Sequence, residues 1–420
     1  MTLILQLYRG VMHGLSPLAP ILYDRRLSAG KELPGRLNER LARNLPERPS
    51  GLLVWMHGAS VGESKLLLGL AEALHETRPS LNILFTSQTA SSADIVSRDM
   101  PRQAVQQMAP LDTPDAARRF VEHWGPDICV FAEGEIWPNL LSDCKAHGCK
   151  TVLVNARMTE KSIAGWQRAP RTARKLFSKF DTVLASDRRT AAGLSQMTGR
   201  KIESSGNLKV ALAGRKRMQD SAPQTPPHRL FPSARQVLLG ASTHPGEERL
   251  LLQTLTTLPD ETCLILAPRH IDRVDEITAL AAEMKFEFIT RSSGKPISEI
   301  TRVLIADTLG EMDNWYQSAD KVYLGGGHRL GIGGHNPLEP LSYGLPIITG
   351  PYTENFSDTY ETLTLLDCVQ IAGDTETMQE ALAQIKPPKA SALDAYFTQY
   401  QKTLETTLSA MTALLDEKAQ

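Results

Sequence analysis

Carboxylates that follow short apolar runs are the residues of this sequence best suited to acid–base chemistry. Glu63 ends the stretch WMHGASVGE (55–63), and Glu133 and Glu135 lie in FAEGEIWPN (131–139). A carboxylate at the end of a strand can accept a proton from a substrate hydroxyl. The pair in the second stretch is costly to bury unless it is hydrogen-bonded or solvated. It could orient a polyhydroxylated or cationic group, and a structural hydrogen-bonded pair is the alternative.

Glu63 also has a purely structural interpretation. Ser60 and Glu63 have the spacing of a capping box, in which Ser60 is the N-cap and Glu63 the third helical residue. A cap accounts for both residue types, whereas a catalytic base requires the carboxylate to meet a substrate. The local sequence leaves both roles open.

Six glycines in LGGGHRLGIGGHNPLEP (324–340) form the densest small-residue cluster. Such a loop allows a ligand to approach the backbone closely. Asn336, Pro337 and Glu339 fit the N-cap, first and third positions of a helix of about two turns. The loop and helix together predict a phosphate cradle, although Glu339 could instead accept hydrogen bonds from ribose hydroxyls.

Three further segments could bind an anion. GASTHPGEE (240–248) predicts a helix start with Pro245 in its first turn, APRH (267–270) places Arg269 after a strand, and DTLGE (307–311) ends another strand. The dinucleotide spacing GxGxxG and the P-loop sequence GxxxxGK[ST] are both absent. Dehydrogenases and P-loop NTPases are therefore disfavoured.

Composition excludes other classes. The chain has 420 residues, 41% hydrophobic and 22% charged, with a formal charge of -1, which is typical of a soluble globular protein of two or three domains and disfavours a globally basic nucleic-acid binder. Five scattered cysteines fit a reducing compartment. Cys144 and Cys149 flank His147, but no second ligand pair follows at zinc-site spacing, so we expect small buried hydrophobes and no metal.

The candidate catalytic and binding residues follow short apolar runs, which alternate along the chain with stretches of helical periodicity. Runs of this kind predict parallel sheets buried on both faces, whose ligands bind at the carboxyl ends of the strands and in a cleft between domains. The expected strands are 52–58, 82–88, 128–133, 151–156 and 182–187, and then 236–242, 263–269, 303–308, 321–326, 346–350 and 369–373. The fold class is therefore α/β, with two Rossmann-like doubly wound domains.

The same patterns give domain boundaries. Residues 211–235 are rich in proline and polar residues and are interpreted as a linker. The expected parts are an N-terminal segment at 1–49, a first domain at 50–210, a second domain at 236–390 and a C-terminal helix at 391–420, which could pack back on the first domain.

The N-terminal segment has two interpretations. Residues 1–23 are interrupted by Arg9 and His13 and contain no apolar run of about 18 residues, so we do not expect them to span a membrane. They could form an amphipathic helix in the interface of an anionic membrane, followed by a basic stretch at 24–49, or a surface helix packed on its own domain. A second basic run at 157–179 could meet phosphates or be a solvated helix face.

Eight motifs, in order, resemble the 3-deoxy-D-manno-octulosonic acid (Kdo) transferases of lipopolysaccharide assembly. They are WMHGASVGE, FAEGEIWPN, NARMTEKS (155–162), GNLK (206–209), GASTHPGEE, APRH, DTLGE and GGHNPLEP (333–340). The resemblance implies a GT-B glycosyltransferase that has its acceptor on the N-terminal domain and its sugar nucleotide on the C-terminal one. It also implies CMP-Kdo as donor, a lipid A precursor such as lipid IVA as acceptor, and attachment to the cytoplasmic face of the inner membrane.

The resemblance also implies roles for single residues. Glu63 matches the family's catalytic base, and Glu133 and Lys209 match residues that stabilise the transition state. The residues that match the CMP-binding segments are Pro268, Arg269, Leu309, Gly310, Glu311, Asn336, Pro337, Leu338 and Glu339. Further donor-site candidates are Ser242, Thr243, Gly333, Gly334 and His335. Acceptor-side candidates are Ser60, Gly62, Glu135, Asn155 and Arg157.

The chain departs from the family at two positions. Gly134 stands where relatives commonly carry threonine or serine, and Gly58 where alanine is common. A donor with one phosphate does not require a chelated metal ion, so no cofactor is expected. Two alternatives remain: another GT-B enzyme, such as a UDP-sugar transferase or a nucleotide-sugar epimerase, and a non-catalytic membrane scaffold, which the intact Glu63, Glu133 and Arg269 disfavour.

Overall fold

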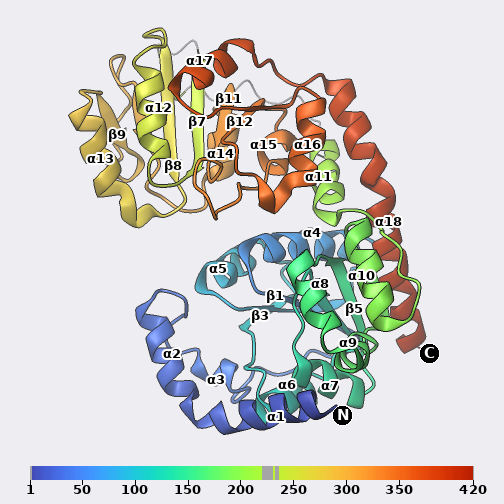
Figure 1. Cartoon of the computed structure of the whole chain (residues 1–420). Coiled ribbons are helices and arrows are strands. Elements are labelled where there is room, and N and C mark those ends of the chain that lie inside the picture. Colours follow the sequence, from blue (N-terminus) through green and yellow to red (C-terminus); the bar gives the residue numbers. More distant parts are fainter. Residues whose placement is uncertain (1, 220–229, 232–235, 420) are drawn as a thin grey trace. The chain divides into compact units, whose positions relative to one another are not determined.

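Two compact units make up the computed structural model, which describes residues 2–219, 230–231 and 236–419 (Figure 1). The first unit contains Met1–Leu212 and Tyr400–Gln420, and the second contains Ala213–Gln399. Each unit has its own parallel sheet with helices on both faces, as the alternating sequence pattern predicts.

The first unit is built on a six-stranded sheet with the order β3-β2-β1-β4-β5-β6. Its strands are β1 (Leu53–Gly58), β2 (Asn82–Ser87), β3 (Val105–Met108), β4 (Ile128–Ala132), β5 (Lys150–Ala156) and β6 (Thr182–Ala185). Its helices are α4 (Val61–Thr77), α5 (Ala90–Asp99), α6 (Pro114–Trp124), α7 (Pro138–Ala146), α8 (Glu160–Gln167), α9 (Pro170–Phe177) and α10 (Arg188–Thr198), followed by α11 (Leu208–Gln219), which continues into the second unit.

Both faces of this sheet are packed. Val54 and Met56 of β1 join one core cluster, which includes the apolar side of α4, and Leu53 and Trp55 join the other, which includes residues of α6, α7 and α9. Successive strand residues point to opposite faces, so a strand buried on both sides must be apolar throughout. This explains the continuous apolar runs in the sequence.

The chain begins with helices that lie against this unit. They are α1 (Leu3–Leu15), a 3-10 turn (Ser16–Leu18), α2 (Ala19–Ser28) and α3 (Leu37–Arg40). Tyr8 of α1 donates a hydrogen bond to Asp112 at 2.8 Å, and Leu5 is buried. Across residues 2–219, 230–231 and 236–419, no helix combines the length and the apolarity needed to cross a bilayer.

The second unit has a seven-stranded parallel sheet with the order β13-β12-β11-β7-β8-β10-β9. Its strands are β7 (Gln236–Thr243), β8 (Thr262–Pro268), β9 (Phe288–Thr290), β10 (Val303–Ile305), β11 (Lys321–Leu324), β12 (Ile347–Thr349) and β13 (Val369–Ile371). Its helices are α12 (Glu247–Leu255), α13 (Val274–Glu283), α14 (Met312–Gln317), α15 (Leu338–Ser342), α16 (Ser357–Leu365) and α17 (Thr375–Gln384), with 3-10 turns at Ile271–Arg273, Arg291–Ser293 and Glu354–Phe356.

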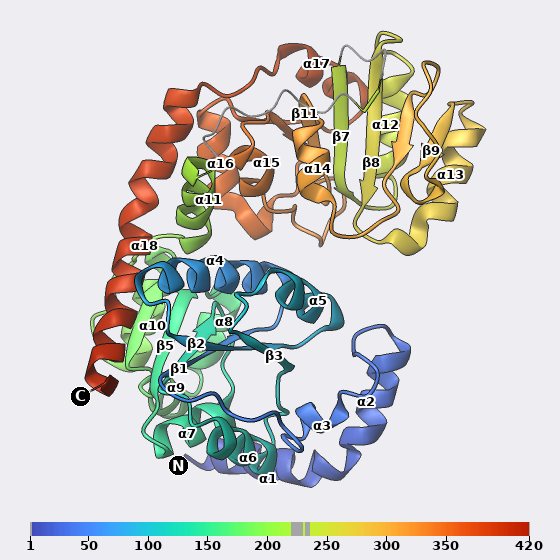
Figure 2. The ribbon, with the colours of Figure 1, turned by 180° about the vertical axis from the view of Figure 1, so that it is seen from behind.

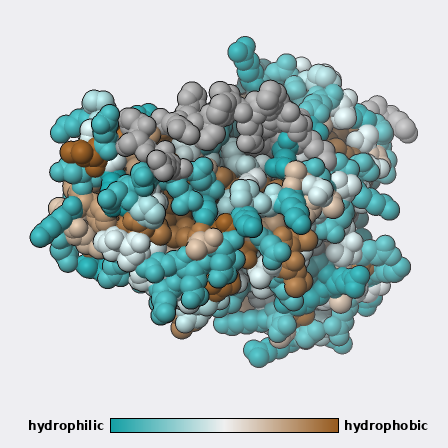
Figure 3. Space-filling model, turned by 90° about the horizontal axis from the view of Figure 1, so that it is seen from above, coloured by the Kyte–Doolittle hydropathy of each residue, from teal (hydrophilic) through white to brown (hydrophobic). Residues whose placement is uncertain are grey.

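The last helix, α18 (Ala390–Ala419), contributes to both units (Figure 2). Leu393, Tyr396 and Phe397 are buried in its first half. Its second half belongs to the first unit, and its buried side chains there are part of that unit's core; they are Leu404, Met411, Leu414 and Leu415. The surface seen in Figure 3 is largely hydrophilic, with smaller hydrophobic areas.

Several sequence predictions need correction. Residues 211–219, expected in a linker, continue α11 as a helix, and positions 220–229 and 232–235 lie outside the described residues. Strands β3 and β9 were not predicted. Helix α12 begins at Glu247 with Gly246 as N-cap, so Pro245 precedes the helix. Helix α15 is a single turn whose N-cap is Pro337 and not Asn336. The Asn336 side chain still accepts a hydrogen bond from the first helical residue, Leu338 N, at 3.2 Å.

Candidate active site

Glu63 lies in the first turn of α4, directly after β1. Its backbone N–H donates to Ser60 Oγ at 3.2 Å, and its carboxylate accepts from Ser60 Oγ at 2.9 Å and from Ala59 N at 2.7 Å. The predicted cap is therefore present. Burial raises the pKa of the Glu63 carboxyl, and the nearby carboxylates of Glu135 and Glu133 raise it further, against the lowering effect of the Ala59 and Ser60 hydrogen bonds. A carboxylate with a raised pKa is a stronger base, so capping and proton transfer are compatible.

Glu133 and Lys209 form an ion pair beside this helix start. Lys209 Nζ lies 2.6 Å from Glu133 Oε1, which also accepts from Asn155 Nδ2 at 3.1 Å. A methyl group placed on Gly62 would lie 3.6 Å from Lys209 Nζ, which places the ammonium group against the first turn of α4. The structure thus brings Glu63, Glu133 and Lys209 together from three separate segments.

The backbone around this pair is strained. Glu133 and Asn155 both have positive φ, at 53° and 50°. Asn155 Oδ1 accepts a hydrogen bond from Leu208 N at 2.9 Å, which ties the end of β5 to the start of α11. Arg157 N donates to the Glu133 carbonyl at 3.4 Å. Non-glycine residues in the left-handed region persist where surrounding contacts hold them, and they cluster at functional sites.

Glu135 belongs to a polar group that the sequence did not reveal in full. It accepts a hydrogen bond from the Trp137 indole at 2.8 Å and lies 3.3 Å from His57 Nε2. Although burial alone would raise the pKa of the Glu135 carboxyl, His57 and Trp137 hold it below its ordinary value. His57 Nδ1 in turn lies 2.8 Å from Thr86 Oγ1. Glu135 therefore stays ionised beside Glu63, and His57 is a member of the site that sequence reasoning missed.

The two departures from the family differ in their surroundings. A methyl group on Gly134 would meet only the Arg157 carbonyl oxygen, at 3.9 Å, so a larger side chain would fit there. A methyl group on Gly58 would come within 3.1 Å of Glu63 Cβ and Leu67 Cδ1. Gly58 therefore gives the Glu63 side chain more room than alanine would.

In the second unit, a buried carboxylate ties together two segments that follow strands. Glu247, 1% exposed, accepts hydrogen bonds from His244 N at 2.8 Å and Gly326 N at 3.0 Å through Oε2, and from His328 N at 3.1 Å through Oε1. A methyl group on Gly325 would overlap the Ser242 carbonyl oxygen. Only glycine allows the loops after β7 and β11 to approach so closely. The sequence singled out neither Glu247 nor His244.

His244 and His335 form a pair next to Arg269. Their Nε2 atoms lie 2.8 Å apart and their rings stack at 5.0 Å. Burial, together with the Arg269 guanidinium and the neighbouring imidazoles, lowers the pKa of His335 to about 4, and burial lowers that of His244 as well. Both rings are therefore mostly uncharged at neutral pH. The predicted donor residues Ser242, Thr243, Arg269 and His335 thus gather at the carboxyl ends of β7 and β8.

The helix start at α12 is a poorer anion site than the sequence suggested. Glu247 and Glu248 occupy its first turn, and both are buried. Arg273 neutralises Glu248 through two hydrogen bonds at 2.8 and 3.1 Å, and Thr243 Oγ1 donates to Glu248 at 2.7 Å. Two carboxylates oppose the attraction that a helix N-terminus has for an anion. Arg269 and the glycine loop remain as the features suited to a phosphate.

The glycine loop and the strand ends position the remaining donor candidates. Gly333 and Gly334 have positive φ, at 78° and 75°, and precede His335, whose carbonyl accepts a hydrogen bond from Tyr360 at 2.8 Å. Pro268 ends β8. Asn336, Pro337, Leu338 and Glu339 form the entry and first turn of α15.

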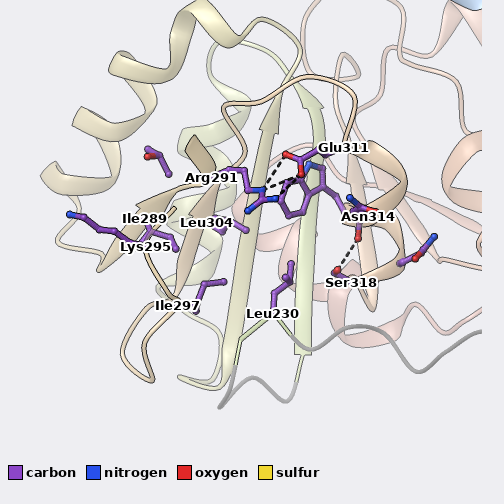
Figure 4. A pocket seen from close by; sticks show the side chains of 12 residues that line it. Leu230, Ile289, Arg291, Lys295, Ile297, Leu304, Glu311, Asn314 and Ser318 are labelled. Atoms are coloured by element: carbon purple, nitrogen blue, oxygen red, sulfur yellow. Dashed lines mark hydrogen bonds and ion pairs between the residues drawn. The ribbon is translucent and has the colours of Figure 1, made fainter. Parts of the chain in front are cut away.

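Glu311 lines a cavity of about 320 Å³ between β9, β10 and α14 (Figure 4). It pairs with Arg291 at 2.9 Å, a residue the sequence did not single out. Leu304 and Trp315 form apolar parts of the lining, and Asn314 and Ser318 add polar groups. Leu309 is 75% exposed and Gly310 has a φ of 84°. The segment thus combines an exposed loop with a cavity that could hold a small, partly polar group.

The basic run at 157–179 forms α8 and α9 of the first unit. A hollow of about 500 Å³ lies there, and its lining includes Trp166, Pro170, Arg171 and Arg174. Two guanidinium groups beside an aromatic ring suit a phosphate or carboxylate with apolar surroundings.

Comparison with known proteins identifies the family. A family model described as 3-Deoxy-D-manno-octulosonic-acid transferase (kdotransferase) matches residues 35–212. A 3-deoxy-D-manno-octulosonic acid transferase of Rickettsia bellii is 31% identical over 353 residues, covering 83% of this chain and 82% of that protein. Its counterpart from Bordetella pertussis is 31% identical over 371 residues, covering 84% of each chain.

Solved structures support the fold. A UDP-GlcNAc 2-epimerase from Methanocaldococcus jannaschii aligns with a TM-score of 0.56 at 14% identity, covering 86% of this chain and 100% of that one. The wall teichoic acid polymerase TagF aligns with a TM-score of 0.51 at 12% identity, covering 96% and 98%. These likenesses show the two-domain GT-B fold. With relatives this similar over most of its length, the chain belongs to the 3-deoxy-D-manno-octulosonic acid transferase family of glycosyltransferases.

Proposed function

We propose that this protein transfers Kdo from CMP-Kdo to a hydroxyl group of a lipid A precursor such as lipid IVA, with inversion at the anomeric carbon. The observation that carries the proposal is the group formed by Glu63, Glu133 and Lys209, which combines a carboxylate of raised pKa with a neighbouring ion pair. Family membership supports the sugar, and the motif resemblance supports the nucleotide and the acceptor.

In the proposed reaction, Glu63 takes the proton of the acceptor hydroxyl. At the same time, the oxygen of that hydroxyl forms a bond to the anomeric carbon of Kdo. The bond from that carbon to the phosphate oxygen breaks, and CMP leaves with both electrons. The transition state resembles an oxocarbenium ion, as in glycoside cleavage. In this proposal Glu133, held by Lys209, stabilises the cationic transition state, and Arg269 of the second unit binds the donor phosphate. The single phosphate of the donor needs no metal in this scheme.

Replacing Glu63 by glutamine tests the base. Glutamine keeps the size of the side chain but cannot accept the proton, so transfer should fall by about 10²–10⁴-fold. Transfer to lipid IVA, with CMP-Kdo generated in situ, is followed by mass spectrometry, which also shows how many Kdo units are added. The control is Glu72→Gln, an exposed carboxylate on the same helix.

The two roles of Glu63 give different results. If the residue only caps α4, glutamine also fits the capping box, so the Glu63→Gln protein keeps most of its unfolding free energy and its turnover. If wild-type protein is folded and binds CMP but transfers no Kdo to lipid IVA, the proposed acceptor is incorrect and the proposed nucleotide of the donor is supported. Preference for UDP over CMP in the same binding assay would instead favour another GT-B enzyme.

We further propose that the N-terminal helices hold the protein on the cytoplasmic face of the inner membrane, at an anionic lipid surface. One side of these helices contacts the first unit through Leu5 and Tyr8. Large exposed apolar side chains recur along the segment at Leu3, Ile4, Leu7, Val11, Leu15, Leu18, Ile21 and Leu22. This spacing forms a stripe that suits the membrane interface, and basic residues of 24–49 follow it.

A charge placed in the stripe tests membrane binding. The variant with Leu7→Glu and Val11→Glu should lose most of its flotation with phosphatidylglycerol-containing vesicles, because each charge opposes insertion of the apolar side. Leu365→Glu is the control, since Leu365 is also exposed but lies on α16. Equal flotation of all three proteins would rule out the N-terminal stripe as the anchor.

A further inference from the structure

Three cysteine sulfurs lie together in the first unit, apart from the carboxylates of the candidate active site. Cys129 is on β4, Cys144 on α7, and Cys149 directly precedes β5. Their Sγ atoms all lie within 4.8 Å of one another, and Cys129 Sγ donates to Cys144 Sγ at 3.5 Å. The sequence shows only the short spacing of Cys144 and Cys149, because Cys129 joins them through the pairing of β4 with β5.

The distances suit a metal ion bound by thiolates. Zinc binds cysteine sulfur at about 2.3 Å in tetrahedral sites, which places two sulfur ligands about 3.8 Å apart. Cys129 Sγ and Cys144 Sγ are already 3.5 Å apart, and all three sulfurs lie within 4.8 Å of one another, so small side-chain movements would bring them to this spacing. Thiolates are soft ligands that select zinc and related ions over magnesium or calcium.

Charged side chains near the cluster affect the cost of placing an ion there. Lys418 and His147 are basic side chains close enough to Cys149 to act on it electrostatically. Three thiolates around a divalent ion carry one net negative charge, which costs free energy in an apolar core. The two basic side chains offset part of this cost, whereas the negative charge of Asp143 near Cys144 adds to it.

An ion could reach the cluster from one side. Cys149 is only 2% exposed, but the three preceding residues are exposed: residue 146 ends α7, and 147 and 148 form the turn before β5. Opening of this turn would expose Cys149 without disrupting the sheet. Local opening of surface turns costs far less than global unfolding.

The cluster lies at the base of a functional segment. Glu133, Glu135 and Trp137 belong to the connection between β4 and α7, and Cys129 and Cys144 stand on the two elements that this connection joins. Bonds from the sulfurs of Cys129 and Cys144 to one ion would fix β4 and α7 relative to each other. The position of the candidate catalytic carboxylates would then depend on the thiols.

We propose that Cys129, Cys144 and Cys149 form a structural site for one divalent thiophilic cation of the Zn²⁺ class. Each thiol gives its proton to solvent, and three sulfur–metal bonds form. The ion takes no part in the transfer reaction itself, and its binding is measured without an assay of transfer.

Cadmium is a suitable probe, because its thiolate bonds absorb in the near ultraviolet. Reduced full-length protein is titrated with Cd²⁺ under nitrogen, and thermal unfolding is recorded with and without the ion. The expected result is one Cd²⁺ per chain with a rise in Tm, since an ion that binds the folded state stabilises it. Cys149→Ser should weaken binding at least tenfold, whereas Cys263→Ser, a buried cysteine of the second unit, should bind as wild type does.

Three results would overturn the proposal. One is the absence of thiolate absorption in protein shown to be folded. Another is a fall in Tm, which would mean that Cd²⁺ binds thiols of the unfolded chain. The third is equal binding by Cys149→Ser and wild type. If Cys149→Ser does not fold, Cys129→Ala replaces it, because alanine leaves no polar group in the core.

Discussion

Glu63 lies where helix capping and proton transfer make different demands on a carboxylate. A cap is strongest when the carboxylate is ionised and fully hydrogen-bonded, whereas a base must have a pKa near the working pH. Burial and the carboxylates of Glu135 and Glu133 raise the pKa of Glu63, and two hydrogen bonds only partly oppose them. The neighbouring charges thus tune the residue as a base while its contacts keep it in place.

The pH profile tests this tuning through Glu135. The ionised form of Glu63 is the base, so kcat/KM should rise as pH increases through the raised pKa of this residue. Glu135→Gln removes a neighbouring negative charge, which lowers the pKa of Glu63, and the acid limb should move to lower pH. The measurement is the pH dependence of kcat/KM for Kdo transfer.

The exposed Glu72 on the same helix supplies the control for this profile. Glu72→Gln removes an equal charge farther along α4 and should leave the acid limb in place. An unchanged limb in Glu135→Gln would mean that another group sets it. A limb that moved to higher pH would contradict the proposed electrostatic coupling.

Among the elements, the loops after β7 and β11 depend on one buried side chain. Glu247 accepts three backbone N–H groups, from His244, Gly326 and His328. These groups would otherwise be buried without partners, which costs about 1–3 kcal/mol each. Glu247 therefore acts as a positioning residue for His244 and the glycine loop.

Replacing Glu247 by glutamine should loosen this arrangement. The amide retains one acceptor oxygen, but its NH₂ group would face backbone donors, so at least one hydrogen bond is lost. We expect CMP affinity to fall at least tenfold and the unfolding free energy to fall by about 1–3 kcal/mol. Calorimetric titration with CMP and denaturant unfolding measure the two effects.

Glu283→Gln is the control for the same unit. Glu283 pairs with Arg249 on the surface at 3.3 Å, and such a pair contributes about 0–1 kcal/mol. The control should bind CMP as wild type does. A Glu247→Gln protein that lost stability but kept full CMP affinity would limit Glu247 to a role in folding.

How well each strand or helix could be predicted from the sequence depends on how deeply it is buried. Central strands such as β1 and β4 are packed on both faces, so their sequences are continuously apolar and were predicted closely. Strands β3 and β9 lie at sheet edges, where half-exposed residues interrupt the apolar run. Residues 211–219 of helix α11 were assigned to the linker because basic residues obscure the short apolar side of this helix.

The site was predictable where it depends on strand order. Parallel strands place their carboxyl ends at one edge, so the sequence predicted a ligand site among the loops that follow strands such as β1 and β4. The Glu133–Lys209 pair joins positions 76 residues apart and follows from motif resemblance, not from spacing. The role of Glu247 depends on a glycine loop reaching it from β11, a contact that no local pattern indicates.

Over the whole molecule, the first unit contains two distant parts of the chain. Residues of β1 and α4 share a core cluster with Leu404, Met411, Leu414 and Leu415 of α18. Contacts between segments so far apart in sequence form late and slowly, because a long loop must close first. The first unit therefore cannot complete its core until the end of the chain has been made.

Met411→Ala tests this dependence. Met411 is fully buried in the core cluster of the first unit, so truncation to alanine should lower the unfolding free energy by about 2–5 kcal/mol. A chain ending at Gln399 loses all four apolar side chains and should leave the first unit unfolded, which circular dichroism and soluble yield would show. Leu365→Ala, at a residue 80% exposed, should change stability by less than about 0.5 kcal/mol. A truncated chain that folds and unfolds as wild type does would show that the first unit forms its core without α18.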